Sequence, residues 1–491
     1  MNPFPLSRRH FLASAALAAA PSGGDWIPLF DGQSFNGWKP SENTASWKIE
    51  GGCLRANGQR SHLFYQGTVK NADFKNFELE VEYKTVGATN SGVFFHTKFQ
   101  DKGWPDKGFE VQICNTHLGE GNYRERKKTG SLYGVRNVYK AFTKDDEWTT
   151  LNIQVRANRV QVRLNGMLTV DFVEPKPPVL ASDGRGRFLD HGTFALQGHD
   201  PASTVLFRKV LLRPLPDDLP VESPPVVDDT YRAILELGAR NVPVVDYHSH
   251  LKMGLTLEEL LRRSRATGIF YGVAINCGKG FTVENRDGIQ KFVADMRGAP
   301  IFVAMQAEGR EWINMFSSDD VAQFDYVFTD SMTWTDNRGR RMRTWIKEEV
   351  GEISDTQEFM VTLVARAVGI LEREPIDIYV NPTFIPDQIQ PRYDELWTDE
   401  RMRKVILAAK KNDVAIEMND RYKLPSPKFL RMAKEEGLKF TFGTNNAGPD
   451  DLRRCDYGLK MTAELKLGWQ DFFIPKPNGE KPVQRRGMPK S

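Results

Sequence analysis

The stretch Asn76-Phe77-Glu78-Leu79-Glu80-Val81-Glu82-Tyr83-Lys84 alternates apolar and polar residues without a break. Because successive side chains of a strand point to opposite faces, this pattern buries one face and exposes the other. Residues 151–155 and 160–164 repeat the alternation, and Asn165-Gly166 then supplies a tight hairpin turn. Many short strands and no long helical window between residues 26 and 214 predict an all-β domain, a sandwich or jelly roll.

A proline-rich linker at residues 214–229 separates this region from a different pattern, in which strands alternate with helices. The expected strands are 242–247, 269–275, 300–305, 325–328, 376–380, 414–418 and 439–442, and the expected helices are 257–267, 286–297, 355–372, 399–412 and 426–436. The pattern predicts an α/β parallel barrel of about seven strands over residues 230–473, with any chemistry at the carboxyl ends of the strands. Residues 474–491 are polar and basic and are expected to form a flexible, solvated tail.

Length and composition limit the classes of function. A chain of 491 residues accommodates two to four domains. With 67 Lys and Arg against 64 Asp and Glu, it is close to neutral, which argues against a nucleic-acid or membrane-surface binder and favours small neutral or anionic ligands. The four cysteines are widely separated, so neither a zinc ribbon nor a disulfide scaffold is indicated. No nucleotide cofactor is expected, and the oligomeric state is left open.

The first twenty residues have the pattern of an export signal. Ser7-Arg8-Arg9-His10-Phe11-Leu12 precedes a short apolar run at residues 13–20, which matches a twin-arginine signal. A membrane span needs roughly 20 apolar residues, more than this run provides. We therefore expect residues 1–20 to be a signal peptide and the mature protein to be periplasmic or otherwise exported.

A polar face in the all-β region is a candidate binding site. In the stretch Phe109-Glu110-Val111-Gln112-Ile113, period two places the three apolar residues on the core face and Glu110 with Gln112 on the opposite face. Gln197 and His199 share a face in the same way. With Trp148 or Tyr133 nearby, such a face would suit a sugar, whose hydroxyls meet polar groups while its ring stacks on an aromatic side chain. The alternative is an ordinary solvated outer face.

Several short motifs in this region occur in a characteristic order. They are Leu29-Phe30-Asp31-Gly32-Gln33-Ser34-Phe35-Asn36-Gly37-Trp38, Asn90-Ser91-Gly92-Val93, residues 109–113, Thr129-Gly130-Ser131-Leu132-Tyr133-Gly134, Asp146-Glu147-Trp148-Thr149, Leu164-Asn165-Gly166, Ala195-Leu196-Gln197-Gly198-His199 and Phe207-Arg208. Together they resemble the 3-keto-disaccharide hydrolase family over residues 25–213. The resemblance implies a concanavalin-like jelly roll that cleaves glycosides oxidised at carbon 3. This chain has Cys114-Asn115 where the family usually has Asp after the Glu-x-Gln strand.

Such a substrate requires a base, an acid and stabilisation of an enolate. A ketone at carbon 3 acidifies the proton on carbon 2, so that removal of this proton lets the oxygen on carbon 1 depart. The candidates for base and acid are His199 and Glu110. The other candidates are Lys128 and Arg208 for the enolate oxygen, or a divalent ion in their place, and Gln112, Tyr133, Trp148 and Gln197 for the sugar. For each residue the alternative is a structural hydrogen bond or a surface charge.

A second candidate site lies at the start of the barrel. Asp246-Tyr247-His248-Ser249-His250 ends the first strand, and two histidines at i and i+2 leave a strand on the same side, as metal ligands do. Glu308 and Glu417 follow other strands and could complete the set. The alternative for a lone His-x-His on an interior strand is polar packing.

The barrel region resembles the PHP (polymerase and histidinol phosphatase) superfamily over about residues 240–465. The matching stretches are residues 246–250, 376–382, 415–419 and 442–446. The resemblance implies a distorted seven-stranded barrel in which two or three divalent metals drive hydrolysis. However, no histidine follows His250, and Asn381 stands before Pro382 where His-Pro is usual. Because amides bind divalent ions poorly compared with imidazole or carboxylate, we expect a single divalent ion on His248 and His250 with Glu308 or Glu417, or a structural barrel without metal.

The sequence thus favours an exported carbohydrate-active enzyme that cleaves 3-keto-glycosides by proton abstraction at carbon 2 and elimination and hydration at carbon 1. The alternative is a non-catalytic, sugar-binding jelly roll attached to a metal-dependent PHP-like hydrolase barrel.

Overall fold

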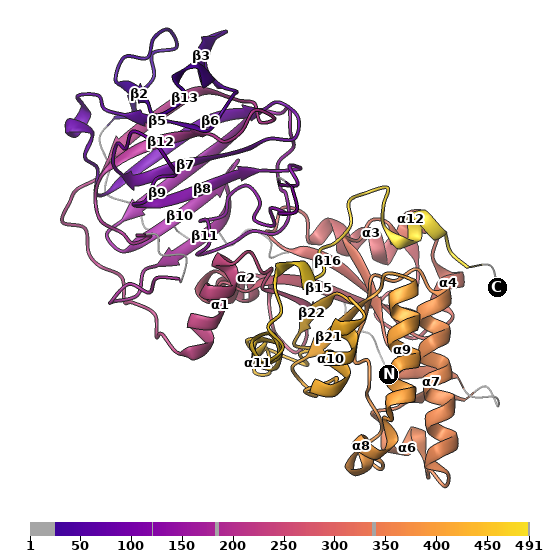
Figure 1. Cartoon of the computed structure of the whole chain (residues 1–491). Coiled ribbons are helices and arrows are strands. Elements are labelled where there is room, and N and C mark those ends of the chain that lie inside the picture. The colour runs from indigo at the N-terminus through magenta and orange to yellow at the C-terminus, as the bar shows by residue number, and fades with distance from the viewer. Residues whose placement is uncertain (1–24, 120, 182–185, 336–339, 490–491) are drawn as a thin grey trace, which may run out of the picture.

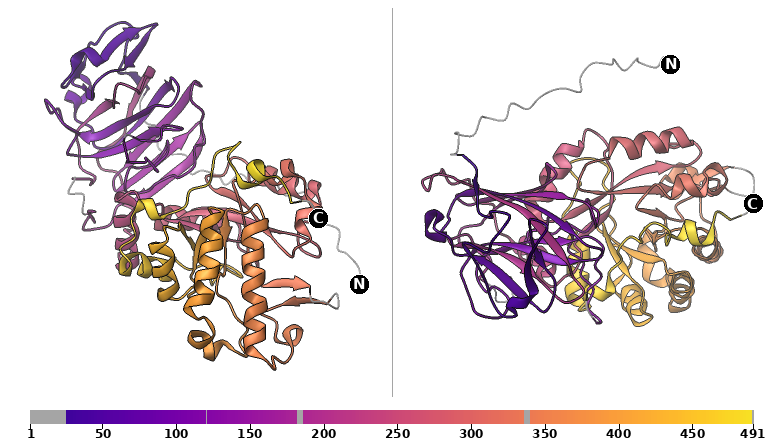
Figure 2. Two further views of the ribbon diagram at one scale, coloured as in Figure 1. Left: turned by 45° about the vertical axis from the view of Figure 1, so that its right-hand side comes forward. Right: turned by 90° about the horizontal axis from the view of Figure 1, so that it is seen from above.

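The computed structural model describes residues 25–119, 121–181, 186–335 and 340–489. An all-β unit lies at one end of the molecule and a mixed helix and strand unit at the other (Figure 1; Figure 2). The expected signal peptide at residues 1–20 lies outside the described residues. Within the described part of the chain, no helix is long and apolar enough to cross a membrane.

The all-β unit is a sandwich of two mainly antiparallel sheets, as the alternation predicts. Its strands are β1 (Ile27–Pro28), β2 (Trp38–Pro40), β3 (Trp47–Glu50), β4 (Cys53–Ala56), β5 (Ser61–Tyr65), β6 (Phe77–Thr85), β7 (Asn90–Thr97), β8 (Phe109–Cys114), β9 (Thr149–Arg156), β10 (Arg159–Leu164), β11 (Met167–Val173), β12 (Thr193–Gly198) and β13 (Val205–Pro214). One sheet has the order β11-β10-β9-β6-β13-β4-β3, with β1 on β13, and the other has the order β2-β5-β12-β7-β8.

The sandwich core lies between these sheets. The apolar side chains of β6 and β9 face those of β7, β8 and β12, and Phe109, Val111 and Ile113 are buried among them, as period two predicts. The turn between β10 and β11 has φ values of 45° at Asn165 and 87° at Gly166. Two consecutive positive φ values characterise the tight turn that matches the twist of a hairpin, so the Asn-Gly prediction is confirmed.

The second unit is a closed barrel of seven parallel strands, which confirms the predicted strand number. The strands are β14 (Val245–Ser249), β15 (Phe270–Cys277), β16 (Phe302–Ala307), β17 (Tyr326–Thr329), β20 (Ile378–Tyr379), β21 (Ala415–Asn419) and β22 (Phe440–Gly443), and β22 pairs with β14 to close the ring. The strands β18 (Thr333–Thr335) and β19 (Arg341–Arg343) form a separate two-stranded antiparallel sheet.

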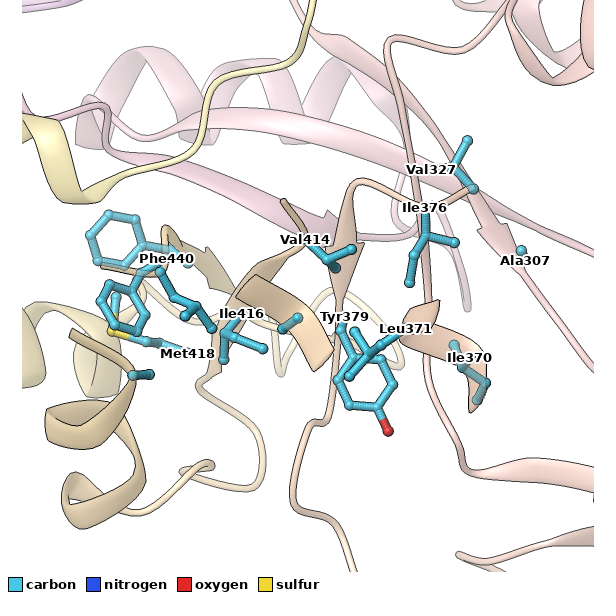
Figure 3. Close-up of a cluster of buried hydrophobic side chains, with 14 of the residues drawn as sticks. Ala307, Val327, Ile370, Leu371, Ile376, Tyr379, Val414, Ile416, Met418 and Phe440 are labelled. Atoms are coloured by element: carbon cyan, nitrogen blue, oxygen red, sulfur yellow. The ribbon is translucent and has the colours of Figure 1, made fainter. Parts of the chain in front are cut away.

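Helices surround the barrel. They are α1 (Asp229–Ala239), α2 (Leu257–Thr267), α3 (Arg286–Asp295), α4 (Trp312–Met315), α5 (Ser318–Val321), α6 (Lys347–Val350), α7 (Thr356–Arg373), α8 (Tyr393–Leu396), α9 (Asp399–Lys411), α10 (Pro427–Glu435), α11 (Asp456–Glu464) and α12 (Pro482–Arg486). An apolar layer joins strands and helices. Figure 3 shows part of it, with side chains of β20, β21 and the end of α7 close together.

The sandwich docks on the amino ends of the barrel strands. Val138 and Tyr139 come from the long β8–β9 connection. They pack in one cluster with Tyr247, Phe270 and other apolar side chains of the barrel strands. Arg136 of this connection donates to the carbonyl oxygens of Arg265 and Ala266 in the last turn of α2, at 2.8 Å and 2.9 Å. The two units therefore share a built interface in addition to the proline-rich connection.

The carboxyl-terminal segment is not the solvated tail that its composition predicts. It contains α12, in which Val483 is buried in the barrel core. The ammonium of Lys481 donates to the carbonyl oxygen of Ala322 at 2.8 Å. Hydrogen bonds to backbone carbonyls and a buried valine hold this basic segment in place, and a composition-based prediction does not detect either.

Candidate functional site

A pocket lies on the outer face of the five-stranded sheet, where the sequence predicts polar side chains. It has a volume of about 340 Å³, in the lower part of the range for small-molecule sites. Glu110 and Gln112 come from β8, Asn90 from β7, Gln197 from β12 and His199 from the residue after β12. Connections outside the sheets add Trp104, Gly119, Tyr123, Glu125 and Tyr133 as walls.

His199 is oriented by a carboxylate. Its Nδ1 lies 2.6 Å from Oδ2 of Asp200, and its Nε2 lies 3.0 Å from Nδ2 of Asn90. Burial acts to raise the pKa of Asp200, but hydrogen bonds from His199 and Ser203 outweigh it and hold that pKa at about 2. An ionised Asp200 favours the tautomer with the proton on Nδ1, which leaves a lone pair on Nε2 and makes the imidazole a base.

Glu110 is the carboxyl group of the pocket floor. Nε2 of Gln197 donates to its Oε1 at 2.9 Å, and the side chain is 7% exposed. Gly92 makes room for it, because a Cβ at this position would lie 2.5 Å from Oε1 of Glu110. The acid and the imidazole therefore occupy one pocket, each held by a neighbouring side chain.

Three residues that line this pocket each have an amide oxygen without a hydrogen-bond partner among the described residues. They are Oδ1 of Asn90, Oε1 of Gln112 and Oε1 of Gln197, all buried. A buried acceptor left unpaired is unfavourable, so such groups point to a ligand that donates hydrogen bonds. The indole of Trp104 lies beside His199, with ring centroids 5.1 Å apart, and gives the pocket an apolar wall.

A second buried carboxylate, Glu125, also lines the pocket. Its Oε2 accepts from the hydroxyl of Tyr133 at 3.0 Å and from that of Tyr123 at 3.1 Å. Burial, followed by the charge of Glu125, raises the pKa of Tyr133 well above its ordinary value. The two phenols therefore remain protonated and present a neutral, polar and aromatic surface to the pocket.

Three of the predicted residues do not reach the pocket. Arg208 pairs with Glu82 on the outer face of the other sheet at 2.5 Å and lies over the ring of Trp148, 4.0 Å from its centroid. The ammonium of Lys128 donates to the carbonyl oxygen of His117 at 3.3 Å. The predicted roles of Arg208 and Lys128 at an enolate and of Trp148 under a sugar ring are corrected accordingly, because sequence proximity to the motifs does not fix the sheet or face.

The sequence prediction missed Asn90, Trp104, Tyr123, Glu125 and the orienting Asp200. The run Arg124-Glu125-Arg126-Lys127-Lys128 has the composition of a solvated segment, yet Glu125 and Lys127 are 5% and 1% exposed. Asp200 had a visible signal, since it directly follows His199. Asn115, where the family usually has an acid, is buried and ties together Thr129 and Thr143 through its Oδ1.

The barrel histidines form a hydrogen-bonded cluster at the carboxyl ends of the strands. Nδ1 of His248 lies 2.6 Å from Oε1 of Glu417, and Nδ1 of His250 lies 3.0 Å from the carbonyl oxygen of Ala274. Their Nε2 atoms are buried and have no partner in the described part of the chain. Glu417 also accepts from the backbone nitrogen of Asn381 at 2.8 Å and from Nδ2 of Asn419 at 3.0 Å.

The expected ligand set, His248 and His250 with Glu308 or Glu417, does not form a group of three potential ligands in the described residues. Among the residues that the structure describes, no group of three or more His, Cys, Asp or Glu side chains could hold a metal ion. Glu308 accepts from Asn276 at 2.7 Å, and burial together with the neighbouring Asp330 raises its pKa. Amide groups donate to Oε1 of Glu308 and to Oε2 of Glu417, and His248 and His250 are the two imidazoles of the barrel unit, so this donor set does not fit the multinuclear metal site that the resemblance implies.

By fold and site, the amino-terminal unit belongs to the class of β-sandwich domains that carry a polar, aromatic-walled pocket on one sheet. The sequence profile of the 3-keto-alpha-glucoside-1,2-lyase-like domain matches residues 25–213. A 3-keto-disaccharide hydrolase of Bacteroides thetaiotaomicron is 38% identical over 77 residues, which cover 14% of this chain and 27% of that protein. The chain thus spans about a quarter of the length of this curated relative.

Solved structures also resemble this part of the chain. A crystal structure described as a putative glycosyl hydrolase from Parabacteroides distasonis is 21% identical and covers 39% of this chain and 94% of its own, with a TM-score of 0.34. The carbohydrate-binding module CBM66 from Bacillus subtilis is 15% identical and covers 36% of this chain and 96% of its own, with a TM-score of 0.25.

Proposed function

We propose that this protein cleaves glycosides oxidised at carbon 3 of the sugar and that the reaction takes place in the sandwich pocket. The observation that carries the proposal is the combination of an Asp-oriented imidazole, a buried carboxyl and three unpartnered amide oxygens in one pocket. Unpartnered acceptors suit sugar hydroxyls, and the matched family profile supports the proposed substrate class. The bare geometry would also fit another polyhydroxylated ligand.

The reaction begins with proton abstraction at carbon 2. Nε2 of His199 takes the proton, and the electron pair of the carbon–hydrogen bond delocalises onto the ketone at carbon 3 as an enolate. The pair then returns to form a double bond between carbons 1 and 2, and the bond from carbon 1 to the glycosidic oxygen breaks. Glu110 in its protonated form gives its proton to the departing oxygen. Water adds across the double bond afterwards, with its oxygen on carbon 1 and a proton back on carbon 2.

Neutral groups stabilise the enolate in this proposal. Lys128 and Arg208 lie away from the pocket, and Nδ2 of Asn90 is bound to His199, so the task falls to the amide donor of Gln112. Gln197 holds Glu110, and Tyr133 with Trp104 bounds the sugar. A divalent ion in this pocket is not required by any of these roles.

The test uses the full chain and a 3-keto-glucoside with a chromogenic aglycone. Glu110→Gln and His199→Ala should each lower kcat by on the order of 10²- to 10⁴-fold, while Arg208→Ala on the outer face of the other sheet should leave it unchanged. Both pocket variants should keep the thermal unfolding midpoint within a few degrees. Wild-type turnover in both pocket variants would remove the assignment, and activity lost only in Arg208→Ala would move the site to the other sheet.

A second candidate function is a sugar-binding sandwich attached to a PHP-like hydrolase barrel. The observation in its favour is the pair of unpartnered Nε2 atoms of His248 and His250, each with Nδ1 bound to an oxygen as in metal-ligating histidines. We propose that these two atoms bind at most one divalent ion. Sugar binding without turnover by the wild-type chain, together with metal-dependent phosphoesterase activity, would favour this second function.

We also propose that the protein is exported by the twin-arginine route. Arg8-Arg9 and the apolar run that follows support this proposal. Changing both arginines to lysine should retain the protein in the cytoplasm, since the export receptor reads the arginine pair rather than its charge. Fractionation of cells that express either form checks this, and unchanged export would point to a different pathway.

A further inference from the structure

One wall of the sandwich pocket is held by side chains of the barrel unit. The segment Arg124–Lys127 runs along the interface, with Glu125 facing the pocket. Asn241, which lies between α1 and β14, makes three hydrogen bonds to this segment. Its Nδ2 donates to the carbonyl oxygen of Arg124 at 2.7 Å, and its Oδ1 accepts from the backbone nitrogen of Arg126 and the ammonium of Lys127, both at 3.2 Å.

These bonds hold the residues on both sides of Glu125 in the chain. The backbone nitrogen of Lys127 donates to Oε1 of Glu125 at 2.9 Å, and Oε2 accepts from the two tyrosine hydroxyls of the wall. Lys127 is 1% exposed, with its ammonium 4.3 Å from the ring centroid of Tyr133. Asn241 is itself 3% exposed, so water does not replace its contacts easily.

A second barrel residue contacts the same wall from another element. Trp469, in the short 3₁₀ turn Trp469–Asp471, meets Tyr123 edge to face, with centroids 5.8 Å apart. The guanidinium of Arg126 lies 5.7 Å from the Trp469 ring centroid. Two points of the barrel, far apart in sequence, therefore converge on one stretch of the sandwich.

We infer that Asn241 and Trp469 are positioning residues, through which the barrel unit holds Glu125 and the tyrosine wall of the sandwich pocket in place. The expected effect of these residues on turnover rests on the proposed function, whereas their effect on the pocket wall does not. The sandwich pocket is complete only with the barrel docked, so the two units act as one enzyme. The roles of both residues are indirect, since neither lines the pocket.

The test compares full-chain variants by hydrogen exchange and by kinetics. Asn241 has φ of 64°, which glycine tolerates, so Asn241→Gly removes the side chain without backbone strain. Trp469→Leu removes the ring contact. Asn165→Gly is the matched control, because Asn165 also has positive φ and accepts one backbone hydrogen bond, from Thr150 on the other sheet.

Amides of residues 121–133 should exchange at least tenfold faster in Asn241→Gly and in Trp469→Leu, with the strands of both units unchanged and with no change in Asn165→Gly. On the 3-keto-glucoside, KM should rise by about tenfold, and the pH profile of kcat should keep the wild-type shape, because the His199–Asp200 pair is untouched. Trp469→Phe keeps an aromatic ring against Tyr123, so its KM should lie close to the wild-type value, unlike that of Trp469→Leu.

Unchanged exchange at residues 121–133 in both variants would overturn the inference. Faster exchange throughout the chain would also overturn it, by making the two residues general contributors to stability. If the wild-type chain does not cleave the 3-keto-glucoside, the proposed function fails, while the exchange measurement still decides whether the barrel holds this wall.

Discussion

At the scale of single residues, Gly92 determines where the pocket carboxyl can lie. The Cβ of an alanine at this position would lie 2.5 Å from Oε1 of Glu110, closer than unbonded atoms approach. Gly92→Ala should therefore displace Glu110 from Gln197 and lower kcat/KM by about 10- to 100-fold, because small misplacements of a reacting group are costly. Steady-state kinetics measure this. Gly369→Ala on α7, where a Cβ would meet open space, is the control, and equal kinetics in both variants would contradict the assignment of Glu110.

Asp200 provides a second prediction at this scale. With a pKa of about 2, its carboxyl is ionised throughout the physiological range and holds the Nδ1 proton of His199. In Asp200→Asn the amide nitrogen can replace Oδ2 and donate to Nδ1, which would move the imidazole proton to Nε2 and remove the base. We expect kcat to fall by on the order of 10²- to 10⁴-fold.

Kinetics of Asp200→Asn between pH 5 and 9 check this prediction. Asp171→Asn, which alters an ion pair on the other sheet, is the matched control. A normal rate for Asp200→Asn would show that His199 needs no orienting carboxylate and would weaken its assignment as base.

At the scale of elements, a buried acid directly before β20 links barrel stability to pH. Burial raises the pKa of Asp377 to about 7, and its Oδ2 accepts from the backbone nitrogen of Val327 at 2.9 Å. The folded state therefore keeps a proton that the unfolded chain releases above about pH 4. Its stabilising contribution is fully present below about pH 4 and is lost as pH rises through about 7, at about 1.4 kcal/mol per pH unit.

Asp377→Asn resembles the protonated form and carries no such titration. Its free energy of unfolding relative to wild type should therefore increase by a few kcal/mol between pH 5 and pH 8. Urea denaturation at the two pH values measures this difference. Asp413→Asn on the surface serves as control, and a pH-independent difference for Asp377→Asn would contradict the prediction.

The elements differ in how far the sequence predicts them. Period two places Phe109 and Glu110 on opposite faces of β8 because burial on one face enforces the alternation, and this prediction is confirmed. The seven barrel strands can also be predicted from the sequence, because burial makes each of them an apolar run between amphipathic helices. The pocket walls come from Trp104 and Glu125 in connections without periodicity, whose placement depends on tertiary contacts such as that with Asn241.

At the scale of the whole molecule, the two ends of the barrel differ in what they contact: one end binds the sandwich and the other contains a polar cluster. The amino ends of the strands receive Val138 and Tyr139 of the sandwich, and Tyr139 donates its hydroxyl to the carbonyl oxygen of Val242 at 3.2 Å. The polar cluster around His248 and Glu417 lies at the carboxyl ends. Because parallel strands all run the same way, the docked sandwich and the histidine cluster occupy opposite ends of the barrel.

This arrangement predicts that the histidine cluster and the sandwich pocket are independent. In the full chain, the double variant His248→Ala/His250→Ala should leave kcat and KM on a 3-keto-glucoside within about twofold of wild type, in contrast to Asn241→Gly at the docked end, since distant sites without shared partners act additively. Wild-type protein equilibrated with Zn²⁺ or Mn²⁺ and then dialysed should retain at most one ion per chain, and the double variant none. Elemental analysis and kinetics on the same samples decide this. Two or three retained ions, or loss of glycoside cleavage with the metal, would show that the barrel cluster takes part in the reaction and would favour the metal-dependent hydrolase.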